Sequence, residues 1–221
     1  MMRRFLRQNG LSLVLLVSFF LLLVGQSWVG LAQYNEERRE RRLPPLNYPA
    51  YLASSHFWEA TTENWESEFF QMSIYVLLTA YLFQRGSSES KSLEGENPQD
   101  EDPRRHRRDP DAPWPVRRGG WVLRLYEYSL SLAFVTLFLL SVALHGWSGC
   151  RLYNEEQTAL GEPPIGFLEY LGTSRFWFES LQNWQSEFLA VASIVLLSIF
   201  LRHRGSPESK PVAAPHWQTG E

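Results

Sequence analysis

Two copies of one polar and aromatic hexapeptide stand 119 positions apart in this chain, NWESEF from Asn64 and NWQSEF from Asn183. On a helix, side chains four positions apart share a face, so Asn64 lies beside Glu68 and Asn183 beside Glu187. Carboxylate and amide oxygens bind hard cations and accept hydrogen bonds from polar solutes. If the four side chains face one another, they form a candidate polar site for a cation or a polar substrate.

The two glutamates also fit a purely structural role. Each stands at the start of an uncharged run, 69–83 or 188–201, rather than inside it. A carboxylate at that place lies in a hydrated headgroup region, whereas ionisable groups deeper in a membrane are costly and often functional. The position of Glu68 and Glu187 favours the hydrated interpretation. Their repetition does not decide between the two, because copies of one unit share structural needs as well as functional ones.

The remaining reactive side chains follow no spacing typical of a catalytic or metal site. The sequence contains no CxxC, HExxH or GxSxG pattern and no glycine-rich phosphate loop. Its one cysteine, Cys150, cannot form an intrachain disulfide. The five histidines are scattered and have no mutual spacing suited to a metal. We therefore expect a protein that is not an enzyme and that holds no cofactor and no metal.

Apolar segments alternate with blocks of charge along the chain, although the average composition is ordinary at 44% hydrophobic residues. The first segment, 11–31, has 21 residues. As a helix rising about 1.5 Å per residue it is roughly 30 Å long, which is enough to cross a bilayer. The arginines before it also fit a secretory signal. A similar segment recurs in mid-chain at 130–147, which favours a retained anchor over a cleaved signal.

The second and fourth apolar segments, 69–83 and 188–201, are short, with 15 and 14 residues. Each segment follows an aromatic stretch that is compatible with a helix. In the first copy, a continuous helix over about 62–84 would cross the membrane with its polar first turns among the lipid headgroups. Both copies end on an Arg-Gly pair, at Arg85 and Arg204. A cation in the last turn followed by glycine is typical of a helix end.

The similarity between the two halves extends far beyond the hexapeptide. With a single offset of 119 and no gaps, residues 34–91 match 153–210 at 26 of 58 positions. We interpret this as a tandem duplication of one unit. The predicted organisation is a first repeat (1–91), a disordered linker (92–120), a second repeat (121–210) and a disordered tail (211–221).

The predicted fold is an all-α integral membrane protein with four transmembrane helices, arranged as two tandem helical-hairpin repeats with interfacial aromatic helices. Each repeat crosses twice, so both repeats face the same way. The amino terminus up to Arg7, the segment 85–124 and the chain from residue 202 onward together carry fifteen of the 21 lysines and arginines, and the two inter-helix loops carry six. By the positive-inside rule, both termini and the linker are predicted to be cytoplasmic.

The basic cluster RRHRR at 104–108 has two interpretations. It contacts anionic lipid headgroups, or it only sets the topology, which is the interpretation that we favour. Acidic residues on both sides argue against nucleic acid. The expected partners are the lipid bilayer and either a second copy of the chain or another membrane protein.

The motif string FLRxNGLSLVLL, GQS, YNEE, PP, YL, FWEATxENWESEF and RGSxESK resembles a family of small bacterial membrane proteins described as a domain of unknown function. The resemblance implies a bacterial integral membrane protein with two similar halves, and hence a place in the bacterial cell (inner) membrane. It implies no activity and no site residue. We expect a non-enzymatic membrane or envelope interaction protein. The alternative is a small transporter or channel for a cation or polar solute, acting as an oligomer because four helices leave little room for a pore.

Overall fold

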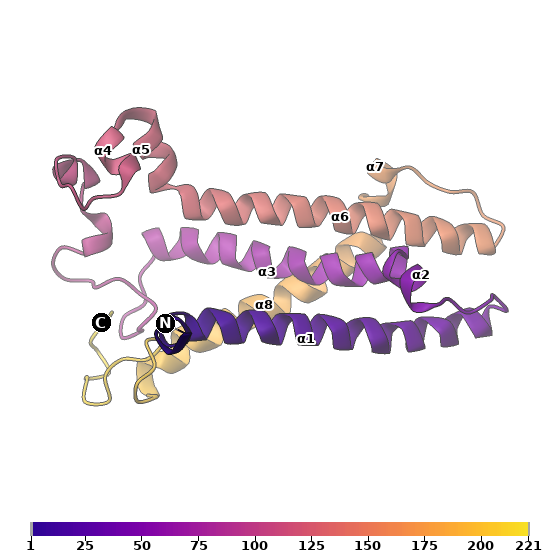
Figure 1. Ribbon diagram of the computed structural model, residues 1–221, viewed down its shortest axis with the longest axis horizontal. Helices are drawn as coiled ribbons and strands as arrows, with labels where there is room; N and C mark the ends of the chain where they lie inside the picture. Colours follow the sequence, from indigo (N-terminus) through magenta and orange to yellow (C-terminus); the bar gives the residue numbers. More distant parts are fainter. Residues whose placement is uncertain (1, 221) are drawn as a thin grey trace. The chain divides into compact units, whose positions relative to one another are not determined.

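The computed structural model describes residues 2–220, and every regular element within that range is helical (Figure 1). Four long helices dominate: α1 (Met2–Glu40), α3 (Ser55–Tyr81), α6 (Ser129–Ala159) and α8 (Ser174–Phe200). Short elements connect them: α2 (Tyr48–Leu52), η1 (Pro98–Asp100), η2 (Pro103–His106), α4 (Trp114–Arg118), α5 (Gly120–Glu127) and α7 (Phe167–Tyr170). The all-α class predicted from the sequence is confirmed for the described part of the chain.

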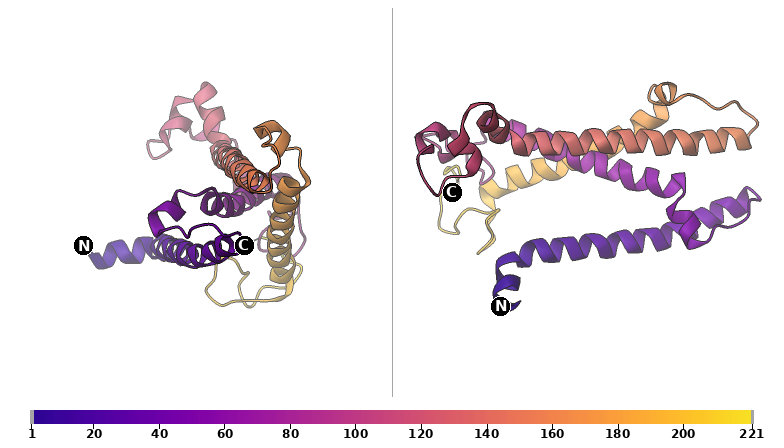
Figure 2. Two further views of the ribbon diagram at one scale, coloured as in Figure 1. Left: turned by 90° about the vertical axis from the view of Figure 1, so that its right-hand side faces the viewer. Right: turned by 45° about the horizontal axis from the view of Figure 1, so that its top comes forward.

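The chain divides into two compact units. The first unit holds the chain up to Thr61 together with Leu144–Tyr170, and the second holds Thr62–Ala143 together with Leu171–Glu221. In the first unit, α2 lies along the later part of α1, and α7 folds back over the later part of α6 (Figure 2). Each unit contains pieces of both predicted repeats, so the repeat boundaries stay a prediction.

Three helices are long and apolar enough to cross a membrane: α1 from Arg4 onward, α6 and α8. Most of their apolar surface is exposed, since at most 17% of the most apolar stretch of each is buried within the protein. Apolar helix faces of this size are normally covered by lipid or by a partner. The helix α3 has 27 residues, but four glutamates in its first half make it less apolar. Three of the four predicted spans therefore meet both criteria of length and composition.

Side-chain caps fix where the two later helices of the predicted hairpins begin. The Ser54 hydroxyl accepts a hydrogen bond from the Phe57 backbone N–H at 3.3 Å, and the Thr173 hydroxyl accepts one from Phe176 at 3.3 Å. Such caps satisfy donors that have no partner inside the helix. Serine and threonine are among the residues preferred at such positions.

The predicted ends of the same helices were too late by three to four residues. The helix α3 ends at Tyr81 and α8 at Phe200, so Arg85 and Arg204 lie beyond the last turn. The backbone N–H of Gln84 instead binds the Ser90 hydroxyl at 3.0 Å, and His203 binds Ser209 in the same way at 2.9 Å. The serines of the RGSxESK tails thus take over backbone donors that a longer helix would have used.

Candidate functional site: a polar contact between α3 and α8 and paired contacts in the hairpins

The four residues of the candidate polar site lie on α3 and α8 in the second unit. Asn64 and Glu68 are exposed, whereas Asn183 and Glu187 are half-buried. The Glu68 and Glu187 carboxylates are near enough to repel each other. The Asn183 side-chain amide donates to the carboxylate of Glu63 and to the backbone oxygen of Glu179 rather than to either of these glutamates. The structure thus places the two glutamates on neighbouring helices of the second unit, where each charge influences the other.

A glutamine that the sequence analysis did not single out joins the same two helices. The Gln71 side-chain amide donates a hydrogen bond to the backbone oxygen of Glu187 at 2.9 Å. Gln71 and Glu63 have no equivalent in the second copy, where alanine and glutamine stand 119 positions later. They therefore lacked the repetition that drew attention to Asn64 and Glu68. Polar side chains that bond between helices are typical of packing inside a membrane.

An aromatic cluster fills the space beside these polar contacts. The Phe70 ring on α3 lies 4.3 Å from the Trp184 ring and 5.7 Å from the Phe188 ring, both on α8. The Phe70 ring also lies 5.0 Å from Phe138 on α6, and Phe138 lies 6.3 Å from Trp184, all measured between ring centroids. None of the four candidate residues lines either of the two cavities found in the second unit. Around Phe70, the helices meet through packed rings.

In the first unit, a tyrosine of each connecting segment packs against a glycine of the preceding long helix. Tyr51 on α2 lies so close to Gly30 on α1 that an added Cβ on the glycine would overlap its hydroxyl. Tyr170 on α7 makes the same approach to Gly149 on α6. Both tyrosines are buried, at 2% and 0% exposure. Burial raises the pKa of the Tyr51 hydroxyl to about 12, with the Glu37 charge as a smaller cause, so it stays protonated at neutral pH.

An asparagine holds the loop after each of these long helices. The Asn35 amide accepts from the Leu46 backbone N–H at 2.7 Å and donates to the Leu46 oxygen at 3.0 Å. Asn154 binds both backbone groups of Ile165 at 2.8 and 2.9 Å. Two bonds to one residue fix the loop's return and satisfy a backbone pair that would otherwise lack partners.

The acids of the second YNEE sequence bind residues of the first half of the chain. The Ser55 hydroxyl donates to the Glu155 carboxylate at 3.0 Å, and Arg41 pairs with Glu156 at 3.3 Å. The partly exposed ion pair contributes little to stability, whereas the Ser55 hydroxyl is buried. These contacts join the first hairpin to α6 within the first unit.

The two RGSxESK tails also meet, in the second unit. The Ser88 hydroxyl donates to the Glu208 backbone oxygen at 3.1 Å, and the Ser87 and Ser198 hydroxyls share a hydrogen bond at 3.0 Å. Burial, reinforced by the nearby Glu208, raises the pKa of the Glu89 carboxyl, while a hydrogen bond from the Tyr75 hydroxyl at 2.9 Å opposes that rise. An acid with a raised pKa marks this junction as sensitive to pH.

A comparison with known families matches residues 2–221 of the chain, nearly its full length. The chain belongs to the family described as a domain of unknown function, DUF6766. The family resemblance expected from the motif string is thereby confirmed. No curated protein and no solved structure matches the chain. Because the DUF6766 description carries no activity, the function of this member is argued from its own contacts.

Proposed function

We propose that this DUF6766 chain is a multi-pass membrane protein with four spanning helices, built as two tandem hairpins that arose by duplication. The helix bounds support the duplication. Ser55–Tyr81 and Ser174–Phe200 begin and end 119 positions apart, and the ends of α1 and α6 at Glu40 and Ala159 differ by the same 119 positions. The tyrosine–glycine and asparagine–loop contacts recur at that same offset.

The fourth span is α3, which is less apolar than its counterpart α8. Two of its polar side chains are used in contacts with α8: Glu63 accepts from Asn183, and Gln71 donates to the Glu187 backbone. A polar group that finds its partner inside the protein need not face lipid, which lowers the cost of inserting the helix. The distribution of lysine and arginine supports a cytoplasmic linker and cytoplasmic termini. A bacterial inner membrane is the location that we infer.

We further propose that the protein is not an enzyme and acts by binding, with a second copy or another membrane protein as its partner. The observation that carries this proposal is the bonding of Gln71 and Asn183 between α3 and α8 beside the packed ring of Phe70. Polar residues there hold two helices together. The exposed apolar faces of α1 and α8 offer surface to lipid and to a partner.

The alternative function, transport of a cation or polar solute by an oligomer, is favoured by one observation. Glu68 on α3 and Glu187 on α8 are near enough for the charge of Glu68 to act on Glu187, and acids that stand near one another attract cations. In this alternative the pair lines a path that only the oligomer completes.

Reconstitution separates the two functions. The purified chain is inserted into liposomes loaded with K⁺, and K⁺ efflux is followed with a potassium-sensitive dye. A binding protein gives the same efflux as empty liposomes, and Glu68→Gln with Glu187→Gln leaves it unchanged. Efflux that depends on the wild-type chain and is abolished in the double variant would replace the binding function with transport.

A further inference from the structure

A small helical cluster in the second unit includes much of the predicted linker (92–120), which was expected from its composition to be disordered. The cluster consists of η2 and α4 from the linker and of α5, which lies almost entirely in the predicted second repeat, and the three follow one another just before α6 (Figure 1). Val116 on α4 and Leu123 on α5 are buried, at 7% and 4% exposure. These two apolar side chains give the cluster a small core. The many charged residues of the segment made such a core hard to predict from its composition. We call η2, α4 and α5 the basic cluster.

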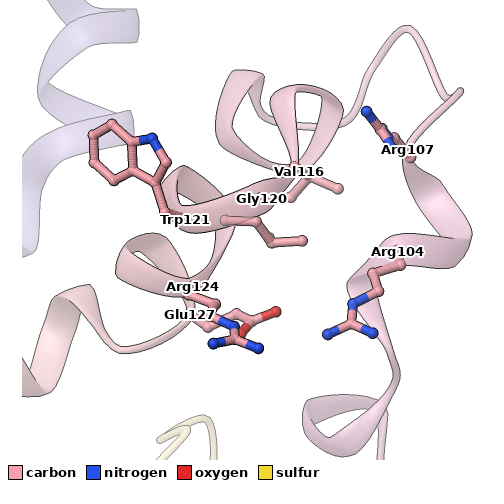
Figure 3. A pocket seen from close by; sticks show the side chains of 9 residues that line it. Arg104, Arg107, Val116, Gly120, Trp121, Arg124 and Glu127 are labelled. Atoms are coloured by element: carbon pink, nitrogen blue, oxygen red, sulfur yellow. The ribbon is translucent and has the colours of Figure 1, made fainter.

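The basic cluster surrounds a cavity of about 550 Å³. Arg104 on η2 and Arg107 directly after it belong to one stretch of chain, and Arg124 belongs to α5, so two segments bring arginines to the lining. Figure 3 shows Arg104 and Arg124 with their guanidinium groups turned toward the same space. Glu127 is the one acid in the lining, so the lining carries a formal charge of +2 from three arginines and one glutamate.

Few acids compete for these arginines. Within residues 2–220, no ion pair is recorded for Arg107 or Arg124, and Arg104 has only a long one, 3.9 Å to Asp102, with both side chains exposed. Their charge is therefore available to a ligand. Guanidinium groups bind phosphate through two parallel hydrogen bonds, which makes arginine the preferred residue for recognising it.

Gly119 keeps the cavity open beside Arg107. Its φ of +71° lies in the region that favours glycine. The Cζ atom of Arg107 lies 3.4 Å from where a Cβ on Gly119 would stand, so the guanidinium group rests against this turn. A side chain at position 119 would strain the backbone, because its φ is positive.

The surroundings of the cavity are those of a membrane surface. Trp121, in the lining, is 76% exposed, and Trp114 on α4 and Tyr128 after α5 are exposed as well. Tyr128 is followed directly by α6, one of the helices that can cross a membrane. Exposed tryptophan and tyrosine beside the start of a span are typical of the water–lipid boundary. The three arginines therefore stand near the level of the lipid headgroups.

We propose that the cavity of the basic cluster binds the phosphate of an anionic phospholipid headgroup at the membrane surface where α6 begins. The inference rests on α6 as a membrane span, but not on the number of spans, their orientation or the choice between binding and transport.

The test uses the full chain purified in a neutral detergent, with short-chain phosphatidylglycerol as the probe and short-chain phosphatidylcholine as the uncharged reference. Binding is measured by quenching of tryptophan fluorescence with a brominated form of each lipid. The pocket variant is Arg104→Gln, Arg107→Gln and Arg124→Gln. Its matched control is Arg105→Gln, Arg108→Gln and Arg117→Gln, which removes the same charge from the same segment without touching the lining.

The wild-type chain is expected to bind phosphatidylglycerol more tightly than phosphatidylcholine. Since each basic residue near an anionic surface contributes roughly fivefold, the pocket variant should bind about 100-fold more weakly. The control variant should lose less than about tenfold in affinity for phosphatidylglycerol, because the attraction to a diffuse positive surface is screened by salt. Equal losses in the two variants, or no preference for phosphatidylglycerol, would overturn the proposal.

A competition arm separates lipid from soluble phosphate. Inorganic phosphate at millimolar concentration should leave phosphatidylglycerol binding nearly unchanged, because it lacks acyl chains to seat beside Trp121. If inorganic phosphate displaces the lipid completely at equal concentration, the cavity is a site for a soluble phosphate compound and the lipid assignment is wrong. Circular dichroism of the pocket variant and of the control checks that both retain the wild-type helix content.

Discussion

The hydroxyl of Tyr51 occupies the space beside Gly30 that a side chain at position 30 would need. The ring is 2% exposed and also lies against Tyr34, at 6.1 Å between centroids, so it has little freedom to move away. In the second half of the chain, Tyr170 stands against Gly149 and Tyr153 in the same way, with 5.8 Å between the two tyrosine rings. The connecting segment of each hairpin is thus locked to its first helix by a tyrosine that only glycine can accommodate.

Substitution of either glycine tests this lock. Gly30→Ala and Gly149→Ala should each lower the free energy of unfolding by about 1–3 kcal/mol, because the packed tyrosine must shift to make room. Thermal unfolding in detergent, followed by circular dichroism, measures the change. In Gly30→Ala combined with Tyr51→Phe, the hydroxyl is removed and part of the loss should be recovered.

Gly25→Ala is the matched control for the lock. No atom lies within 4 Å of a Cβ added at Gly25, which also lies on α1. Alanine there should be neutral or should stabilise the helix by about 0.5–1 kcal/mol. The lock would be refuted if Gly30→Ala behaved like this control.

The asparagine clamps should have similar energetic weight in the two halves. Asn35→Ala and Asn154→Ala each leave a backbone N–H and a backbone oxygen without their partners, which costs about 1–3 kcal/mol for a buried group. Both variants should therefore unfold at clearly lower temperature in the same assay. Asn9→Ala removes only a single exposed bond to the Phe5 oxygen and should change little. A large loss for one clamp and none for the other would contradict the equivalence of the two loops.

The sequence was enough to predict some of these features and not others. The tyrosine and glycine positions are identical in the two copies, yet they are 21 residues apart in each, so a sequence comparison cannot show that they touch. The caps at Ser54 and Thr173 were predictable because a cap acts within one turn of its helix. The ends at Tyr81 and Phe200 were not, since they depend on serines that return from further along the chain.

The candidate polar site shows the same limit. The sequence singled out Asn64, Glu68, Asn183 and Glu187 through their repetition, and a shared helix face was sound reasoning for each pair. Which face meets which neighbour depends on how α3 and α8 pack. In the structure one bond across these helices joins Asn183 to Glu63, which is not repeated, and another joins Gln71, also not repeated, to the backbone of Glu187.

Packing between α3 and α8 can be measured through Phe70 and Trp184. A double-mutant cycle with Phe70→Ala and Trp184→Ala should give a coupling energy of about 0.5–1.5 kcal/mol, the usual value for aromatic rings in contact. The free energy of unfolding in detergent is measured for the wild-type chain, the two single variants and the double variant. Phe200, exposed at the end of α8, replaces Trp184 in the control cycle and should give a coupling near zero. A null result for Phe70 with Trp184 would mean that the two rings do not pack.

The junction of the RGSxESK tails should make stability depend on pH. The pKa of Glu89 is raised above its ordinary value of 4.5 in the folded protein, with burial as the main cause, so the folded state binds this proton more tightly than the unfolded state does. Its stabilising contribution is complete below the unfolded pKa and is lost as the pH rises through the folded pKa.

Glu89→Gln should remove this loss of stability with rising pH. Between about pH 4 and pH 7, the melting temperature of the wild-type chain should fall by more than the melting temperature of the variant. Glu94→Gln, at an exposed position of the same segment, should follow the wild-type curve. If Glu89→Gln and Glu94→Gln gave the same pH profile, Glu89 would not be the group responsible.

The four-span arrangement as two tandem hairpins is tested most directly by cysteine labelling in cells that produce the protein. In a Cys150→Ser background, single cysteines replace four exposed residues outside the long helices: Leu43, Leu93, Leu160 and Val212. With four spans, a membrane-impermeant maleimide labels positions 43 and 160 in intact cells, and it labels 93 and 212 only after permeabilisation. If α3 did not cross, positions 43, 93 and 212 would be labelled together and position 160 would be protected, which would contradict the account.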